Sequence, residues 1–157
     1  MKSIKYIVVA VWMVCICVSC TKGGDLVSAD EDTYTISSTL SGERLSPAVQ
    51  TSATAKASGT YNGGVLNMLT LDVSWEGLLE SGDELVAFDF YNSDARKVRS
   101  ITYHSTAANG NFTISIAGYR GLLPDEQRDL IGGNWKLVLS TQKHPDGIVG
   151  GELAIGK

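Results

Sequence analysis

From residue 33 to the end of the chain, apolar and polar residues alternate with a period of two in one segment after another. Ser52–Tyr61 shows the pattern clearly, with apolar residues or glycine at every second position and Ser, Thr or Lys between them. Successive side chains of a β-strand point to opposite faces of a sheet, so a half-buried strand requires this pattern, whereas a helix does not produce it. The alternation therefore restricts the folded region to β-structure.

Glycine-rich turns divide this region into a succession of short strands, an arrangement typical of a sandwich or barrel. The predicted strands cover residues 33–40, 52–61, 65–75, 84–91, 98–103, 110–117, 135–141 and 148–155. Asn62-Gly63-Gly64 predicts a hairpin between the second strand and the third. We therefore expect an all-β, antiparallel fold of about seven or eight strands.

One short helix is expected at Leu123–Ile131. Pro124 suits the first helical position, acidic residues follow it, and Gly132-Gly133 can supply a left-handed exit. Leu130 and Ile131 would lie beneath the helix at one end of the fold. Trp75 and Trp135 fall on inward faces and are predicted to be core residues.

Residues 1–19 have the features of a signal peptide. Lys2 and Lys5 precede the apolar run Tyr6–Val18, which as a helix would measure roughly 20 Å and so fall short of the ~30 Å hydrocarbon core. The run ends at Val18-Ser19-Cys20, which resembles a bacterial lipoprotein signal cleaved before its cysteine. This resemblance implies lipidation of Cys20, with residues 20–32 as a flexible polar tether. A plain secretory peptide or an N-terminal membrane anchor remains an alternative.

All three cysteines, Cys15, Cys17 and Cys20, precede the predicted domain, so no disulfide is expected within it. The chain has 13 basic and 17 acidic residues, and no basic patch stands out. Binding to nucleic acid is therefore not expected.

Few residues point to chemistry. The histidines are His104 and His144, and a metal site would require both together with Asp89, Asp94 or Asp146. No Gly-x-Ser-x-Gly motif or phosphate-binding loop is present. We therefore predict no catalytic residue, no metal ligand and no cofactor. His144 is expected to open a turn, with a ring nitrogen bonded to a backbone group or to Thr141.

Glycine and aromatic residues add two structural expectations. Gly150-Gly151 predicts a bulge or a close approach of strands. Tyr91, Tyr103 and Tyr119 lie at predicted strand ends or in loops, and they are the nearest approach to a binding surface that the sequence offers.

The last predicted hairpin carries a family resemblance. Thr141, His144-Pro145, Gly147, Val149, Gly151 and Leu153 fall on positions that match the end of CHRD (chordin-type) domains, although Ser140 replaces a histidine. Leu40-Ser41-Gly42-Glu43, followed by Pro47, resembles the opening of the same domains. The resemblance covers about Thr33–Lys157. It implies an immunoglobulin-like Greek-key β-sandwich without known catalysis.

Together these features predict a non-enzymatic lipoprotein of the bacterial cell envelope, in the outer membrane, whose domain binds a protein or a glycan. An envelope-anchored hydrolase or metal-dependent enzyme is the alternative. A third hypothesis is a structural component whose partner is another copy of the same chain.

Overall fold

The computed structural model of the protein describes residues 32–64, 66–118 and 121–157. The predictions for the signal peptide, for Cys20 and for most of the tether fall on residues 1–31, and that for Tyr119 falls on residues 119–120, so all of them lie outside the described residues. Within the described ranges, no helix has the length and apolar character needed to cross a membrane.

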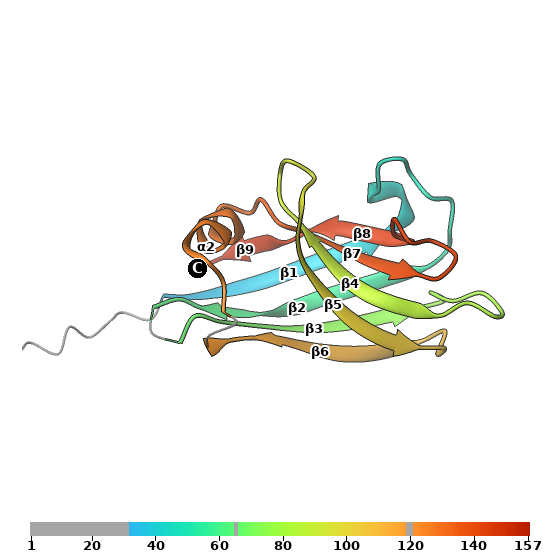
Figure 1. Ribbon diagram of the computed structural model, residues 1–157, viewed down its shortest axis with the longest axis horizontal. Helices are drawn as coiled ribbons and strands as arrows, with labels where there is room; N and C mark the ends of the chain where they lie inside the picture. The colour runs from blue at the N-terminus through green and yellow to red at the C-terminus, as the bar shows by residue number, and fades with distance from the viewer. Residues whose placement is uncertain (1–31, 65, 119–120) are drawn as a thin grey trace, which may run out of the picture. The chain divides into compact units, whose positions relative to one another are not determined.

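Nine strands and one α-helix make up the described domain (Figure 1). In chain order the elements are β1 (Thr33–Ser41), the 3₁₀ turn η1 (Gly42–Arg44), β2 (Thr54–Asn62), β3 (Met68–Glu76), β4 (Leu85–Tyr91), β5 (Lys97–Ser105), β6 (Gly110–Ile116), α2 (Pro124–Ile131), β7 (Lys136–Thr141), β8 (Val149–Glu152) and β9 (Ala154–Gly156). The prediction of an all-β fold with one short helix is confirmed. The last predicted strand is divided at Leu153 into β8 and β9, because the Leu153 N–H donates to the Trp135 carbonyl.

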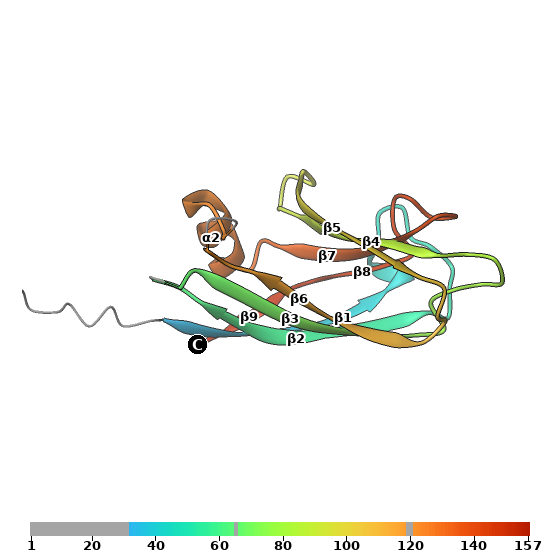
Figure 2. The same cartoon turned by 60° about the horizontal axis from the view of Figure 1, so that its bottom comes forward.

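All strand pairs are antiparallel, and the strands follow one path in the order β5-β4-β7-β8-β1-β2-β3-β6, with β9 added beside β1. The sheet bends from one layer into the other between β8 and β1, which pair only through Ser41 and Gly150. Figure 2 shows the result, in which β4, β5 and β7 form one layer above β1, β2, β3 and β6. The sheet is thus a nearly closed, barrel-like one, and the two separate sheets of an immunoglobulin-like sandwich are not seen.

The predicted hairpin of the second and third strands is confirmed. β2 and β3 pair along their whole length, with Ala55 opposite Trp75 and Tyr61 opposite Leu69. β3 begins at Met68 rather than at residue 65, because the backbone of Asn67 adopts φ +40°, which is outside the extended region. The side-chain amide nitrogen of Asn67 donates to the Leu122 carbonyl at 2.7 Å, and its oxygen accepts the Tyr61 hydroxyl at 3.2 Å.

The core lies between the two layers. Trp75 and Trp135 are 2% and 0% exposed, which confirms their prediction as core residues. The inward face of β2 carries small side chains such as Ala55 and Ala57, which are buried against large side chains of the core. The buried hydrophobic residues include Ile36, Leu40, Ala53, Ala55, Ala57, Tyr61, Leu69, Leu71, Val73, Leu85, Phe88, Phe90, Ile114, Leu130, Leu137 and Leu139.

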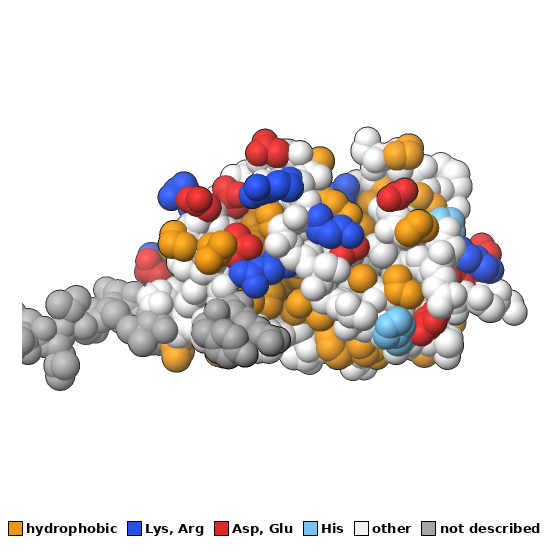
Figure 3. Space-filling view, in the orientation of Figure 1, with side chains coloured by type: hydrophobic (Ala, Val, Ile, Leu, Met, Phe, Trp, Pro, Cys, Tyr) orange, Lys and Arg blue, Asp and Glu red, His pale blue; other side chains and the backbone are white. Residues whose placement is uncertain are grey.

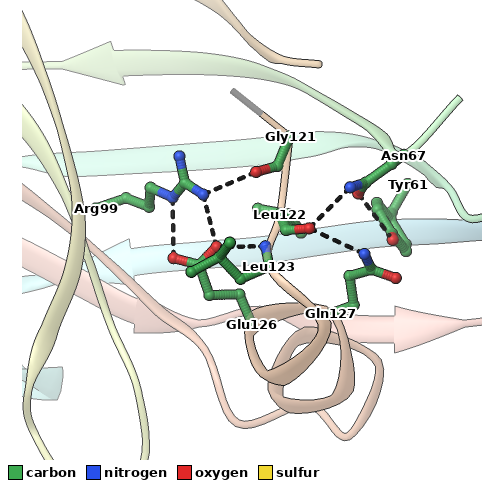
Figure 4. Close-up of polar contacts among 8 residues, drawn as sticks. All are labelled: Tyr61, Asn67, Arg99, Gly121, Leu122, Leu123, Glu126 and Gln127. Atoms are coloured by element: carbon green, nitrogen blue, oxygen red, sulfur yellow. Dashed lines mark hydrogen bonds and ion pairs between the residues drawn. The ribbon is translucent and has the colours of Figure 1, made fainter. Parts of the chain in front are cut away.

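Helix α2 is held to the β-structure by the polar contacts of Figure 4. Glu126 accepts both Nε and Nη2 of Arg99 on β5, at 3.0 and 2.6 Å, and also accepts the Leu123 N–H at 2.7 Å. Burial alone would raise the pKa of Glu126, but the hydrogen bonds from Arg99 and Leu123 hold that pKa below its usual value. Leu130 is buried beneath the helix as predicted, whereas Ile131 is 39% exposed, so that half of the prediction is wrong.

The C-terminal end of α2 has the left-handed exit that Gly132-Gly133 predicts. Gly132 keeps right-handed helical geometry and Gly133 adopts φ +72°, so the left-handed exit falls on Gly133. Ile131 stands just before this exit, at the end of the helix, and its side chain is turned away from the core that receives Leu130.

Candidate functional site: a groove between two loops

A hollow of about 1030 Å³ opens on the outer side of β7 and β8. Its lining comes from four segments that are far apart in the sequence. They are Leu45–Val49 after η1, Tyr91–Ala95 after β4, Gly133–Val138 at the start of β7, and Lys143–Gly147 between β7 and β8. We call this hollow the loop groove. In Figure 3 a notch lies at the top of the view between the turn after β4 and the loop after η1, with hydrophobic side chains beside it.

The first wall of the loop groove is the stretch Leu45–Val49. The chain returns on itself here, because the Gly42 carbonyl accepts both the Leu45 and the Val49 N–H groups, at 3.2 and 3.0 Å. Glycine is required at position 42, since a β-carbon would collide with the Val49 carbonyl oxygen. Lys136 of β7 donates to the Arg44 carbonyl at 2.8 Å, which ties this wall to the sheet. The Ser46–Pro47 peptide bond within it is cis.

The second wall is the loop after β7. The His144 carbonyl accepts the N–H groups of Thr141 and Gly147, and the His144 N–H donates to the Thr141 hydroxyl oxygen, all within 3.0–3.1 Å. The predicted contact between His144 and Thr141 is therefore present, but it runs through the backbone of His144 rather than through its ring. Gly147 has φ +111°, a conformation that other residues rarely adopt.

Asp83, from the loop before β4, holds this second wall from below. Its Oδ1 accepts the N–H groups of Glu84 and Lys143, at 2.9 and 3.1 Å. Burial of Asp83 would raise its pKa, but the Thr141 hydroxyl and these two N–H groups outweigh burial, so the pKa lies below its usual value. Asp83 is therefore ionised at neutral pH, and its carboxylate is the acceptor that holds the loop after β7 in place.

The floor of the groove is Val138, which points to the outer side of β7 yet is only 3% exposed. A β-carbon at Gly150 would lie 2.6 Å from Leu45 Cδ2 and 3.1 Å from Val138 Cγ2, and one at Gly147 would collide with Val138. Glycines at these positions therefore make room for Val138 and Leu45 to meet. The neighbouring Gly151 brings β8 against the Thr39 carbonyl of β1, so the predicted close approach of strands at Gly150-Gly151 is confirmed.

The remaining side of the groove is formed by the end of β4 and the turn that follows it. The half-buried Tyr91 lines this side, and the Lys97 ammonium lies 5.6 Å from the centre of its ring. Asn92 stabilises the turn by accepting the Arg96 N–H at its side-chain oxygen, at 3.0 Å. Of the three tyrosines that the sequence suggests for a binding surface, Tyr91 lies in the groove. Tyr103 instead packs on Phe112, with ring centres 4.3 Å apart.

The polar cluster nearest to a catalytic arrangement lies on the outer face of β4. Asp89 is 1% exposed, and its Oδ2 accepts both the Ser140 hydroxyl and the Lys97 ammonium, each at 2.9 Å. The hydrogen bond to Asp89 raises the pKa of Lys97, so the lysine is a cation and does not act as a base towards Ser140. The arrangement pairs a buried carboxylate with a partly exposed lysine rather than activating a nucleophile.

The candidate metal ligands of the sequence are not assembled into one site. His104 lies on β5, and its Nδ1 is 2.9 Å from Glu84 Oε1. His144 lies in the loop groove, and Asp89 accepts a hydrogen bond from Lys97. Across residues 32–64, 66–118 and 121–157, no group of three or more His, Cys, Asp and Glu side chains is placed to hold a metal ion.

Sequence reasoning located one wall of the groove and missed the other parts. The sequence marks the His144-Pro145-Asp146-Gly147 turn by its proline and glycine, whereas it marks Leu45–Val49 only by Pro47 and carries no prediction for Asp83. The signal for Asp83 was its place after Ser81-Gly82, just before a strand, where an Asp commonly accepts backbone N–H groups. Nothing local indicated which loop it would hold.

Comparison with known proteins gives one match. The family model described as CHRD domain matches residues 36–153, from the middle of β1 to the junction of β8 and β9. The matched range contains all four segments of the loop groove. No curated protein and no solved structure matches the chain.

Proposed function

Because this chain belongs to the CHRD domain family, we propose that it is a non-enzymatic binding module which engages a protein or a glycan in the loop groove. The observation that carries the proposal is the convergence of two distant stretches, Leu45–Val49 and Lys143–Gly147, on one hollow. Both walls are fixed by backbone hydrogen bonds and glycine contacts before any partner arrives. A preformed site of this kind binds without the cost of ordering its loops.

The groove offers both apolar and polar contacts to such a partner. Leu45 and Pro47 provide apolar surface, while His144 and Asp146 lie on the opposite wall. Binding sites typically combine a mostly apolar lining with a few polar groups that fix orientation. This mixture supports a binding role.

Photo-crosslinking in intact cells tests this role. A photoreactive amino acid at His144 would lie in the groove, and the same amino acid at Ser58, an exposed position on the outer face of β2, is the matched control. We expect a discrete adduct from position 144 and none of the same mass from position 58, with the partner identified by mass spectrometry. Equal labelling from both positions would count against the groove as the binding site.

We further propose that the domain is displayed from the bacterial outer membrane as a lipoprotein acylated at Cys20. The support is the sequence Val18-Ser19-Cys20 after a basic start and a short apolar run. Cys20→Ala is expected to give an unprocessed, unlipidated or mislocalised protein, measured by intact mass and by partition into detergent. A fully processed variant recovered in the detergent phase would contradict the anchor.

The alternative of an envelope-anchored hydrolase or metal-dependent enzyme has less support among the described residues, because the Ser140 hydroxyl donates to Asp89, whose carboxylate also accepts the cationic Lys97. Soaking the purified protein with transition metals, followed by elemental analysis, separates the two roles, since stoichiometric retained metal would favour an enzyme. We also propose that this single coiled sheet is a variant of the immunoglobulin-like Greek-key sandwich. Two stacked layers with the core between them support this part of the proposal.

A further inference from the structure

Large hydrophobic side chains that face solvent are few in this domain and lie at one end of it. Among the described residues they are Leu66, Leu123 and Ile131, which are 47%, 64% and 39% exposed. A single exposed leucine on a soluble protein requires no explanation, whereas a group at one location indicates a contact surface. We call these three residues the apolar end.

Two loops and one helix bring the apolar end together. Leu66 lies in the connection between β2 and β3, and Leu123 immediately precedes α2, which ends at Ile131. The neighbours of the two leucines are directly bonded, since the Asn67 amide donates to the Leu122 carbonyl at 2.7 Å (Figure 4). Leu66 and Leu123 are therefore side chains of adjacent loops.

The same end of the domain receives the chain from its N-terminal segment. β1 starts at Thr33 opposite Asn62, and the Gly63 N–H donates to the Asp32 carbonyl at 3.0 Å. The connection that carries Leu66 thus begins beside the first described residue. Figure 1 shows α2 and the start of β1 at the same end of the domain, and Figure 3 shows hydrophobic side chains on that end.

The length of the chain before Asp32 limits how far this end can lie from an anchor at Cys20. The 12 residues from Thr21 to Asp32 span at most about 40 Å when fully extended. A lipid anchor would therefore keep the apolar end within that distance of the membrane surface. Tethering of this kind makes even a weak second contact with the bilayer effective, because the contact becomes intramolecular.

Charges around the apolar end favour an apolar contact over an electrostatic one. Lys157 lies 2.6 Å from Asp32, Arg128 lies 3.1 Å from Asp125, and Arg99 is bound to Glu126. The cations of these pairs are thus accompanied by carboxylates and offer little attraction to anionic headgroups. Leucine and isoleucine side chains at the interface do not need anionic lipid, so zwitterionic lipid suffices for the contact.

We propose that Leu66, Leu123 and Ile131 form a membrane-contact surface, which seats this end of the domain on the bilayer that carries the Cys20 anchor. The inference rests on the proposed lipidation of Cys20. It adds an orientation to that proposal: α2 and the β2–β3 connection face the lipid.

Fluorescence quenching in vesicles tests the orientation. The mature protein, purified with its acyl groups, is reconstituted in phosphatidylcholine vesicles. The vesicles contain a lipid with a quencher in its acyl chain. Asp125→Cys places one dye in the first turn of α2, and Asp94→Cys places the control dye in the β4–β5 turn. Both positions are exposed, and the mature chain offers no other free thiol if Cys20 is acylated.

We expect quenching at position 125 that is several times stronger than at position 94. In the variant Leu66→Ser/Leu123→Ser the quenching at 125 should fall to the level of position 94, while the protein stays bound to vesicles through its anchor. Because both leucines are already about half exposed, this variant should keep its melting temperature, which circular dichroism checks. In salt from 50 to 500 mM the quenching should be unchanged.

Three results would overturn the inference. An acylated, vesicle-bound protein with equal quenching at both positions would leave the anchor intact and remove the contact surface. A thiol-reactive crosslinker at position 125 that captures a protein in cells, with no quenching by lipid, would assign the surface to a protein partner. A native protein whose mass shows no acyl chain would remove the anchor, and the tether argument with it.

Discussion

At position 151 the missing side chain is what allows β8 to lie against β1. An added β-carbon would collide with the Thr39 carbonyl oxygen, a backbone atom that has no rotamer to escape into. The same two strands join the halves of the sheet at Ser41 and Gly150, so the crowded residue stands beside the only β1–β8 pair. Small changes at this position therefore act on the closure of the whole fold.

We expect Gly151→Ala to lower the free energy of unfolding by about 2–3 kcal/mol, because the strands must separate to accept one methyl group. Gly63→Ala is the control, since the nearest atom to a β-carbon there is 3.5 Å away, an ordinary contact. Denaturation in urea measures both variants. A Gly151→Ala protein as stable as Gly63→Ala would show that β1 and β8 are not closely packed at this position.

Asp83 gives a second test at a single residue, this time of the groove. Asp83→Ala leaves the N–H groups of Glu84 and Lys143 without their acceptor, which should cost about 2 kcal/mol for two charge-assisted hydrogen bonds. Amide hydrogen exchange at Lys143 should become faster, because the loop loses its support. Ser81→Ala, which removes an exposed hydroxyl nearby, should leave that exchange rate unchanged.

On the scale of elements, local pattern predicted what each segment is better than where it ends. β5 runs from Lys97 to Ser105 and exceeds its prediction at both ends, because its pairing with β4 continues through an irregular register. Val138 and Asp89 lie on outward positions and are nevertheless buried. Alternation alone assigns such residues to solvent, because it does not show that other segments cover them, Leu45 for Val138 and Lys97 for Asp89.

The candidate site divides in the same way. The turn His144-Pro145-Asp146-Gly147 is visible in the sequence because proline and glycine carry local conformational demands. Its facing wall, Leu45–Val49, depends on a contact between Lys136 and the Arg44 carbonyl across 92 positions of chain. No local preference encodes that contact, so the groove emerges only once the strand order is known.

The helix provides a prediction on pH. Glu126 has a lowered pKa, so its ionised form stabilises the folded state above the ordinary value near 4.5, and this contribution is lost as pH falls through the lower pKa of the folded state. We expect Glu126→Gln to lower the unfolding free energy by about 1–3 kcal/mol at pH 7 and to lose less stability than the native protein between pH 5 and pH 3. Thermal unfolding at each pH measures both effects.

Asp125→Asn, on the exposed side of the same helix turn, is the control for that prediction. Its ion pair with Arg128 is 75–86% exposed, so it should contribute little at any pH. A Glu126→Gln protein with the same acid sensitivity as the native protein would contradict the role assigned to the pair with Arg99.

As a whole, the described domain is a sheet that coils until the two terminal strands of its path, β5 and β6, approach each other without pairing in the strand order. Aromatic rings connect them. Phe112 of β6 lies 4.3 Å from the Tyr103 ring of β5 and 5.4 Å from the Phe88 ring of β4, measured between ring centres. Side-chain packing thus does at this gap what backbone hydrogen bonds do between the other strands.

Phe112→Ala should therefore destabilise the domain by about 2–3 kcal/mol, because it removes the ring that contacts both Tyr103 and Phe88 across the gap. Phe112→Leu keeps most of the volume without the ring and should cost less than Phe112→Ala. Ser115→Ala, an exposed position of the same strand, should have no effect beyond about 0.5 kcal/mol. Urea denaturation followed by tryptophan fluorescence measures the series, since Trp75 lies 6.1 Å from Tyr103 and reports on this cluster. If Phe112→Ala were as stable as Ser115→Ala, the aromatic rings would not be what closes the sheet, and the approach of β5 and β6 would have to come from the turn between them.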